Sequence, residues 1–189
     1  ALVVVVGRRL DHIAGRIEHR PAVDFGQGRG RRMRLAQRAV LEPALVAAQP
    51  LTLDHYCIDF SCSEPVLDEW LKRRAMANQV SGASRTFVVA DKAHRVYGYY
   101  AMAAGAVSHQ LATGGVRRNM PEPVPVIVLA RLAVDTQAQG IKLGGSLLQD
   151  AVNRAVSVAQ NTGVRALLVH ALHERAKLFY EYYGFQASP

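Results

Sequence analysis

The sequence predicts an α/β domain in which a central sheet is flanked by helices. From residue 50 onward, strand-type and helix-type patterns alternate along the chain. Two segments, VIVLARLAVD at residues 126–135 and VRALLVHA at residues 164–171, are almost continuously apolar, which is typical of strands buried on both faces. A turn with three glycines joins the first segment to an amphipathic helix. With 189 residues and 50% hydrophobic content, the chain can bury one domain core.

The amino-terminal half of the domain is predicted to be a helix followed by a hairpin. Residues 63–79, SEPVLDEWLKRRAMANQ, have helical periodicity, with Ser63 as the expected N-cap. We expect Trp70 of this helix to be a core anchor and not a platform for a nucleic-acid base. Two strands follow at residues 85–91 and 96–107, and a loop rich in Gly and Pro comes after them.

The carboxy-terminal half is predicted to be strand, turn, helix, strand and helix. The buried strand at residues 126–135 leads through the glycine turn into a helix from about Gly144 to Thr162. The second buried strand, residues 164–171, is followed by a short helix that Gly184 stops. This order places the glycine turn directly after a central strand, and no internal repeat is present.

Most of the positive charge lies near the amino terminus. The net charge is +8 and the pI is about 9.9. Residues 1–49 hold nine arginines against four acidic residues and show no sustained helical or strand period. We expect them to form a basic extension that is disordered or not native, so that the domain spans residues 50–189. A nucleic-acid-binding arm is the alternative.

The sequence lacks the patterns of a targeting segment, a membrane-spanning helix and a metal site. No charged segment precedes a sufficiently long apolar run, so we expect neither a signal peptide nor a transmembrane helix, a cytoplasmic location and no membrane partner. Cys57 and Cys62 are too few for a disulfide framework. Their C-x4-C spacing has no second pair, so we expect two reduced thiols and no metal.

The glycine turn at residues 135–145, DTQAQGIKLGG, is typical of a phosphate-binding site. A helix N-terminus presents N–H groups without intrahelical partners and a partial positive charge, and glycines let a ligand approach the backbone. The P-loop pattern is absent because Lys142 precedes Gly144, and no G-x-G-x-x-G follows an early strand. On these residues alone, an ordinary turn is the simpler interpretation.

The sequence around this turn resembles the GCN5-related N-acetyltransferases (GNAT). LAVDTQAQGIKLGGSLL followed by VHALHERAKLFYEYYGF is similar to the region in which that family carries R/Q-x-x-G-x-G/A after a central strand. The resemblance implies the GNAT fold, a central mixed and twisted sheet flanked by helices, and acetyl-CoA as the co-substrate. Gln139 then stands at the R/Q position, Lys142 at the first small-residue position and Gly144 at the second. We expect a helical backbone at Lys142, which tolerates a side chain and places an ammonium beside the pyrophosphate.

The resemblance also implies roles for single residues. Tyr180 matches the tyrosine that donates a proton to the departing CoA thiolate, although without the resemblance it would be interpreted as a core aromatic. Val134 matches the strand residue whose backbone N–H faces the acetyl carbonyl. His173 stands where many family members carry Asn and is assigned no role. The expected cofactor-binding residues are Leu132, Val134, Gln139, Gly140, Ile141, Lys142, Gly144 and Gly145.

Longer segments resemble one branch of the superfamily, the acetyltransferase toxins of type II toxin–antitoxin modules. They are SEPVLDEWLKRRAMANQ, SRTFVV, PEPVPVIVLARLAVD and AKLFYEYYGF, and the resemblance covers about Leu51 to Gln186. It implies acetylation of the α-amino group of aminoacyl-tRNA, which blocks translation, and a homodimer. It also implies neutralisation by a ribbon-helix-helix antitoxin that binds operator DNA, so that the pair acts as a repressor.

The acid–base chemistry agrees with an α-amine acceptor. An α-amine has a pKa of about 7.7 to 8 and a lysine amine one near 10.4, so an enzyme for α-amines needs no strong base. None is obvious, because Glu122 lies in a Pro-rich loop and Asp135 at a strand end. Departure of the thiolate is the step that needs assistance. Full proton transfer from a tyrosine would be uphill, since a phenol with a pKa near 10 is a weaker acid than a thiol with a pKa near 8.5. A strengthening hydrogen bond, or a site that lowers the tyrosine pKa, would cover the difference.

If the substrate is transfer RNA, the positively charged residues would bind its phosphates. For each candidate arginine, an ordinary solvated role is equally expected. Tyr99 or Tyr100 would stack on a terminal base. The candidate RNA-binding residues are Arg73, Arg74, Arg85, Arg117 and Arg118.

The end of the chain departs from the family. Family members continue into one more strand after the segment that ends here at Pro189, so we expect a sheet without its last strand and with an exposed edge. Two alternatives to the toxin therefore stay open. One is an N-acetyltransferase of a small amine or a protein N-terminus, and the other is an inactive truncated remnant that only binds its antitoxin.

Overall fold

A seven-stranded sheet forms the centre of the structure, a computed structural model that describes residues 2–6 and 44–188. None of the helices in these ranges is both long and apolar enough to cross a bilayer. In order across the sheet, the strands are β2 (Gln49–Pro50), β3 (Arg85–Ala90), β4 (Val96–Val107), β5 (Val124–Val134), β6 (Ala166–His170), β1 (Leu2–Val6) and β7 (Gln186–Ala187). The helices are α3 (Pro65–Arg73), α4 (Ala75–Ser81), α5 (Gly114–Arg117), the 3-10 helix η2 (Thr136–Ala138), α6 (Leu143–Asn161) and α7 (Glu174–Tyr182).

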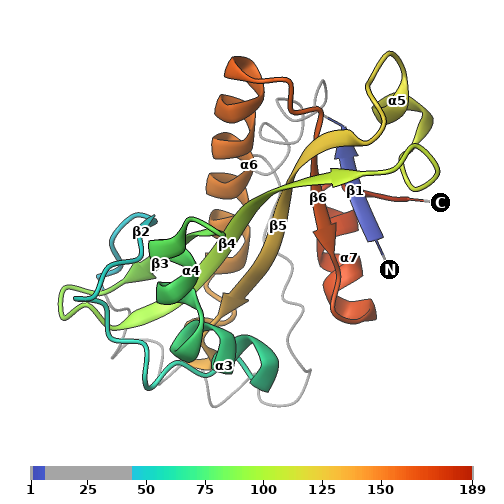
Figure 1. The fold of residues 1–189 in the computed structure, drawn as a ribbon. Coiled ribbons are helices and arrows are strands. Elements are labelled where there is room, and N and C mark those ends of the chain that lie inside the picture. The colour runs from blue at the N-terminus through green and yellow to red at the C-terminus, as the bar shows by residue number, and fades with distance from the viewer. Residues whose placement is uncertain (1, 7–43, 189) are drawn as a thin grey trace.

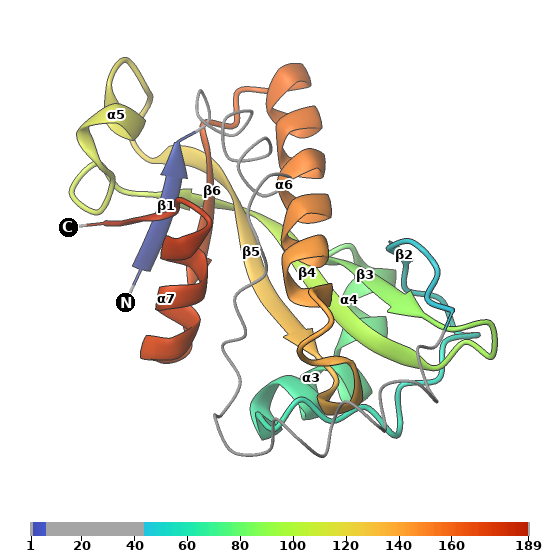
Figure 2. The same ribbon diagram turned by 180° about the vertical axis from the view of Figure 1, so that it is seen from behind.

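Alternation of side chains along the strands builds a core on each face of the sheet. Helices α6 and α7 cover one face and α3 and α4 the other (Figures 1 and 2). On β4, Tyr100 packs with Leu147 of α6, whereas Tyr99 packs with Phe60 and stacks on Trp70 of α3, with ring centroids 5.9 Å apart. The predicted α/β class and the role of Trp70 are confirmed. The expected stacking of Tyr99 or Tyr100 on a base is wrong, because both rings are fully buried.

The central strands β5 and β6 are paired over only part of their length. They are parallel, and their register runs from Val126↔Ala166 to Leu129↔Val169 and stops there. On its other side, β5 stays paired with β4 as far as Val134. The edge of β5 beyond Leu129 is therefore not covered by a strand, and a gap opens between β5 and β6.

The first predicted helix is broken in two. The sequence predicted one helix over residues 63–79, but α3 ends at Arg73 and α4 begins at Ala75. Arg74 is both the C-cap of α3 and the N-cap of α4. Gly82, with φ 79°, ends α4 in the left-handed conformation that suits glycine.

The start of α3 also differs from the prediction. Ser63 is not the N-cap: its φ is 72°, and Glu64 holds the cap position without a side-chain cap bond. The Asp68 carboxylate, inside the helix, accepts the Cys62 N–H at 2.8 Å and so ties the preceding loop to the first turns of α3.

Lys142 has a left-handed backbone at the entry of α6. Its φ is 71° and its ψ is 3°, so the expected helical backbone is wrong. Gly140, two residues earlier, has φ 80°. The turn thus needs two residues of positive φ on either side of Ile141, and glycine supplies only one of them. A non-glycine residue in this conformation costs about 1 kcal/mol.

Glycine at residue 145 is required by helix packing. A Cβ there would lie 2.5 Å from the Tyr183 hydroxyl, whereas at Gly144 the nearest side-chain atoms would lie 3.7 Å away. Gly145 therefore lets α6 approach α7 closely. This need exists whether or not a ligand sits at the turn.

The outer edge of β6 is paired by the start of the chain. β1 runs antiparallel to β6 from Leu2↔His170 to Val6↔Ala166, and β7 pairs with β1. Within residues 44–188, the strand that follows α7 is the two-residue β7. The expected exposed edge does not lie at β6, because β1 pairs with β6. Most of the predicted basic extension, residues 7–43, lies outside the described residues.

The segment just before residue 50 is tied to the sheet. The Val46 N–H donates to the Ala90 carbonyl oxygen at 2.8 Å, and β2 pairs with β3. The Arg154 guanidinium of α6 donates to the Ala48 carbonyl oxygen at 3.4 Å. The folded part of the chain therefore includes residues that precede the boundary expected at residue 50.

Candidate active site

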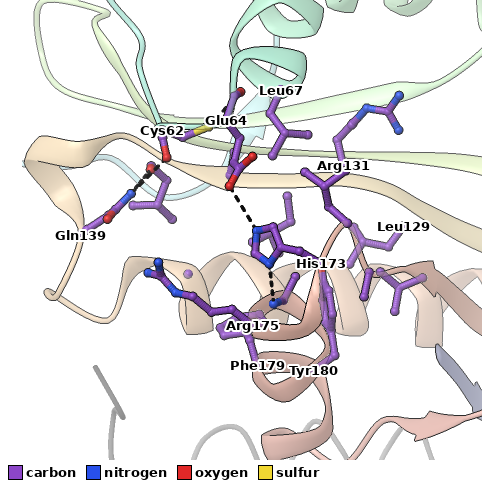
Figure 3. A pocket seen from close by; sticks show the side chains of 18 of the residues that line it. Cys62, Glu64, Leu67, Leu129, Arg131, Gln139, His173, Arg175, Phe179 and Tyr180 are labelled. Carbon is purple, nitrogen blue, oxygen red and sulfur yellow. Dashed lines mark hydrogen bonds and ion pairs between the residues drawn. The ribbon is translucent and has the colours of Figure 1, made fainter. Parts of the chain in front are cut away.

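A cavity of about 980 Å³ opens where β5 and β6 separate. Its walls come from the second half of β5, the β6–α7 loop, one side of α7, the start of α6 and the start of α3 (Figure 3). Helices α6 and α7 lie on one face of the sheet and α3 on the other. The cavity therefore reaches through the sheet, and ligands can approach the gap from both faces.

The uncovered edge of β5 offers backbone donors to this cavity. The Asp135 N–H donates to the Tyr97 carbonyl oxygen on the β4 side at 2.9 Å. Because successive N–H groups of an extended strand point to opposite edges, the N–H groups of Val134 and Leu132 point away from β4, toward the gap. Both residues line the cavity.

Asp135 fixes the end of β5. It is 1% exposed, and its carboxylate accepts the Ser61 N–H at 3.1 Å and the Gln137 N–H at 2.8 Å. The Arg95 guanidinium lies 3.7 Å from the same carboxylate, and the Thr136 N–H donates to the Ser61 carbonyl oxygen at 2.8 Å. One buried carboxylate thus joins β5, the turn toward α6 and the loop before α3. It serves this structural purpose and does not line the cavity.

The turn before α6 forms the electropositive end of the cavity. Gln139 fastens the turn to β5, because its Nε2 donates to the Val134 carbonyl oxygen at 3.2 Å. Residues 143–145, the first turn of the 19-residue helix α6, line the cavity. Lys142 and Arg175 line it as well, and Arg175 extends toward the start of α6 (Figure 3). A helix N-terminus flanked by two cations suits an anion such as a pyrophosphate.

Tyr180 lines the cavity from α7. It is 6% exposed, and its ring contacts Phe179 and Phe185 at centroid distances of 5.2 and 5.4 Å. Burial raises the pKa of Tyr180 well above its usual range. The hydroxyl therefore stays protonated and can donate a hydrogen bond. The site does not lower the tyrosine pKa, which corrects one of the two expected ways of assisting the thiolate and leaves the strengthening hydrogen bond.

Cys62 lines the cavity but is not prepared as a nucleophile. Burial, with a smaller effect of the Asp68 carboxylate, raises the pKa of Cys62 to about 12, so the thiolate is scarce at neutral pH. Both cysteines are free thiols. Among residues 2–6 and 44–188, no group of three or more His, Cys, Asp or Glu side chains is arranged to hold a metal ion.

Glu64 and His173 meet across the cavity (Figure 3). The Glu64 Oε1 lies 3.2 Å from the His173 Nε2. His173 is the N-cap of α7, because its Nδ1 accepts the Ala176 N–H at 3.1 Å. The pair thus links the start of α3 to the start of α7.

The cavity collects most of the expected cofactor-binding residues. Ile141 is the exception, because it packs against the core beside α6 and does not line the cavity. The predicted residues that line it are Leu132, Val134, Gln139, Gly140, Lys142, Gly144 and Gly145, together with Tyr180.

The expected RNA-binding arginines lie outside the cavity. Arg73 pairs with Glu69 at 2.7 Å, and the Arg85 guanidinium donates to the Gln79 carbonyl oxygen at 2.9 Å. Helix α5 and the residue after it carry two more arginines, at the opposite end of the sheet from α3 (Figure 1). The five residues, none of which lines the cavity, are Arg73, Arg74, Arg85, Arg117 and Arg118.

Six charged or titratable cavity residues were not found from the sequence. Arg131 lies on β5 between predicted residues, but its guanidinium turns to the α3 side and sits 5.6 Å from the centroid of the Trp70 ring. The other five come from segments whose meeting no local pattern reveals. The six are Glu64, Arg131, His170, His173, Arg175 and Tyr183.

The fold and the site together define an acetyltransferase of the α/β class. A mixed sheet opens between two parallel strands, a helix N-terminus with two cations stands at one end of the opening, and a buried tyrosine hydroxyl lines its wall. Residues 83–187, more than half of the chain, match the profile of the acetyltransferase (GNAT) domain, and the chain belongs to this family.

Named relatives agree with this assignment. The tRNA-acetylating toxin of Mycobacterium tuberculosis is 55% identical over 130 residues, which are 69% of this chain and 78% of that protein. The structure of AtaT complexed with acetyl-methionyl-tRNAfMet is similar with a TM-score of 0.71 at 25% identity, covering 77% of this chain and 88% of that one. A mutant of KacT reaches the same TM-score and coverage at 22% identity, which shows a shared fold.

Further structures of AtaT extend the comparison. They are 25–26% identical to this chain with TM-scores of 0.61–0.64, and cover 74–76% of this chain and 83–85% of their own. One holds acetyl-CoA bound to AtaTR, one holds the C-terminus of the antitoxin AtaR, and one is the AtaT–AtaR complex bound to DNA.

Replacement of Asp135 by Asn is expected to destabilise the fold by about 2 kcal/mol. An amide has one acceptor oxygen where the carboxylate has two, so one of the backbone N–H groups now bound would lose its partner. Thermal denaturation measures the loss. The control is Asp59→Asn at an exposed position, which should stay within about 0.5 kcal/mol of the parent. Equal melting temperatures for the two variants would contradict the anchoring role of Asp135.

Proposed function

We propose that this protein is an acetyl-CoA-dependent N-acetyltransferase toxin that acetylates the α-amino group of aminoacyl-tRNA and so blocks translation. The observation that carries the proposal is the gap between β5 and β6, where Val134, Tyr180 and the turn before α6 line one cavity. The identity to a protein named tRNA-acetylating toxin supports the choice of acceptor.

Acetyl-CoA is proposed to enter from the face covered by α6 and α7. The N–H groups at the start of α6, with Lys142 and Arg175, bind the pyrophosphate. The N–H groups of Leu132 and Val134 bind the pantetheine arm and orient the thioester carbonyl. The residues present thus fit the co-substrate, which supplies the activated acetyl group.

The transfer is proposed to be direct. The acceptor nitrogen attacks the acetyl carbon, and the C–S bond breaks with its electron pair going to sulfur. The Val134 N–H donates to the carbonyl oxygen while negative charge develops on it, and the Tyr180 hydroxyl donates to the departing sulfur. Because the Cys62 thiol has a pKa of about 12, an acetyl-cysteine intermediate is disfavoured.

The partners follow from the same proposal. A ribbon-helix-helix antitoxin is proposed to neutralise the enzyme and to link it to operator DNA, which the complexes of AtaT with AtaR and DNA support. A homodimer and a cytoplasmic location rest on the family resemblance and on translation as the target. Residues proposed to contact transfer RNA outside the cavity are Arg73, Arg74, Arg85, Arg117 and Arg118.

An enzyme for a small amine or a protein N-terminus is the second candidate. It is favoured by one observation, the position of all five predicted RNA-binding arginines outside the cavity. In that case, acetylation would be insensitive to added RNA. It would also be insensitive to charge reversal at Arg73, Arg74 and Arg85.

Incubation of the purified protein with charged tRNA and labelled acetyl-CoA tests the proposed function. We expect label on the aminoacyl group, and inhibition by excess uncharged tRNA that competes for the same surface. A folded preparation that binds acetyl-CoA but leaves no label on the aminoacyl group would refute the tRNA acceptor. Transfer to small amines in that same preparation would identify the second candidate.

The variant Tyr180→Phe is expected to transfer the acetyl group about 100-fold more slowly, because the departing sulfur loses its donor. Acetyl-CoA binding, measured by calorimetry, should stay unchanged. Tyr182→Phe is the matched control, since Tyr182 lies on the same helix but does not line the cavity. Turnover of Tyr180→Phe at the rate of this control would exclude the donor role.

Two variants of Lys142 separate its charge from its backbone conformation. Lys142→Gly removes both the ammonium and the left-handed cost, and should stabilise the fold by about 1 kcal/mol. Lys142→Asn removes the ammonium and keeps a side chain that tolerates positive φ. If the ammonium contacts the pyrophosphate, both variants bind acetyl-CoA about threefold to fivefold more weakly in low salt, as for an exposed charge pair. Tighter binding by Lys142→Gly would show that the lysine is no phosphate contact.

A further inference from the structure

The Glu64–His173 pair bridges the two faces of the sheet. Glu64 stands at the start of α3, and His173 stands at the start of α7, which packs on the opposite face. Their side chains meet at 3.2 Å, and both residues line the cavity. A contact between these elements must pass through the gap between β5 and β6. The pair therefore lies on the path between the two entrances of the cavity.

His173 lies against the carboxylate of Glu64. Its Nδ1 accepts the Ala176 N–H, so the ring hydrogen of the neutral imidazole belongs on Nε2, which lies 3.2 Å from the Glu64 Oε1. The cap bond thus fixes the ring and its tautomer together. This contact uses one carboxylate oxygen and leaves the charge of Glu64 in the cavity.

The surroundings of Glu64 suit a cation attached to an apolar group. The nearby cavity wall contains Val66 and Leu67 of α3 and Leu172 of the β6–α7 loop, and Val66 and Leu172 are more than half exposed. The cations Lys142 and Arg175 line the end of the cavity at the turn before α6. The α3 side also carries a cation, Arg131, whose guanidinium lies over the Trp70 ring. A carboxylate repels phosphates and attracts ammonium groups, so at its own position Glu64 favours the amine over the cofactor.

We propose that Glu64 binds the α-ammonium group of the aminoacyl acceptor and takes the first of its protons, and that His173 is the positioning residue for the Glu64 carboxylate. This inference rests on the proposed function, because it assigns the acceptor side of the same cavity. It also supplies the proton acceptor that the sequence did not reveal.

The protons balance as follows. An α-ammonium group loses two protons when it becomes an amide. Glu64 takes the first, which frees the nitrogen lone pair to form the N–C bond, and passes it to bulk solvent. As the C–S bond breaks, the sulfur takes the proton of Tyr180. The second proton of the nitrogen returns to the Tyr180 oxygen through water, so both side chains end in their starting states.

The size of the benefit depends on the pH. With an α-amine pKa of about 7.8, roughly 5% of the acceptor is neutral at pH 6.5, so a residue that removes the proton accelerates the reaction by at most about 20-fold there. Above the pKa of the amine, the acceptor is already neutral and the benefit disappears. The proposal therefore predicts that loss of Glu64 slows the reaction more at low pH than at high pH.

The test compares Glu64→Gln with the parent on an aminoacyl-tRNA whose amino acid is joined through a stable amide. We expect the kcat/KM for this acceptor to fall by about 10-fold to 20-fold at pH 6.5 and by less than about twofold at pH 9. Acetyl-CoA binding and the melting temperature should match those of the parent. Glu174→Gln, one residue after His173 and outside the cavity, is the matched control and should show neither change.

His173→Asn tests the positioning role separately. Asparagine keeps the N-cap bond of α7 but is too short to reach Glu64, so we expect an unchanged melting temperature and a smaller fall of kcat/KM, about threefold to fivefold, with the same pH trend. His173→Ala should in addition lower the stability, because it removes the cap.

Three outcomes would overturn the inference. They are equal activity of Glu64→Gln and the parent at pH 6.5, a loss that is the same at pH 6.5 and pH 9, and a parallel loss of acetyl-CoA binding, which would place Glu64 on the cofactor side. A parent protein that binds acetyl-CoA but does not acetylate charged tRNA at either pH would instead refute the proposed function. The two failures are therefore distinguishable.

Discussion

The buried carboxylate of Asp135 is the interaction on which the site depends. Two parallel strands that separate leave backbone groups without ladder partners, and such groups are costly unless something else holds the strand ends in place. Asp135 does so at the end of β5, where it joins the strand to the loop before α3 and to the turn before α6. Because both segments carry cavity residues, one anchor sets the positions of the electropositive turn and of Glu64.

The charged groups of the cavity differ between its two ends, which lie toward opposite faces of the sheet. Lys142, Arg175 and the N-terminus of α6 make one end electropositive, whereas the α3 side carries the carboxylate of Glu64 beside the guanidinium of Arg131. In the proposed reaction, a polyanionic co-substrate approaches the electropositive end and a cationic amine approaches Glu64, and the two meet beside Val134 and Tyr180. This separation orients the reactants before any specific contact forms, since charges act over longer distances than hydrogen bonds.

Elements with strong periodicity could be predicted from the sequence, whereas positions set by distant contacts could not. The strand at residues 96–107 and the end of the last helix at Gly184 follow from local pattern alone. Ser63 was a reasonable cap, but its backbone is left-handed in the packed loop and Glu64 holds the cap position. The left-handed backbone of Lys142 was missed because its side chain gives no local sign of it. The meeting of Glu64 with His173 required the three-dimensional course of α3 and α7.

The pairing of β1 explains how the site keeps its shape where, in the part of the chain that the structure describes, the two-residue β7 follows α7. The last pair between β6 and β5 is at Val169, but β1 pairs with β6 as far as His170, one residue further along the diverging end. The residues that follow, up to His173, form the cavity wall opposite β5. Strand β6 is therefore held on its outer edge at the point where it loses its inner partner. An edge without β1 would leave this wall supported by α7 alone, and the position of His173 would then depend on its cap bond.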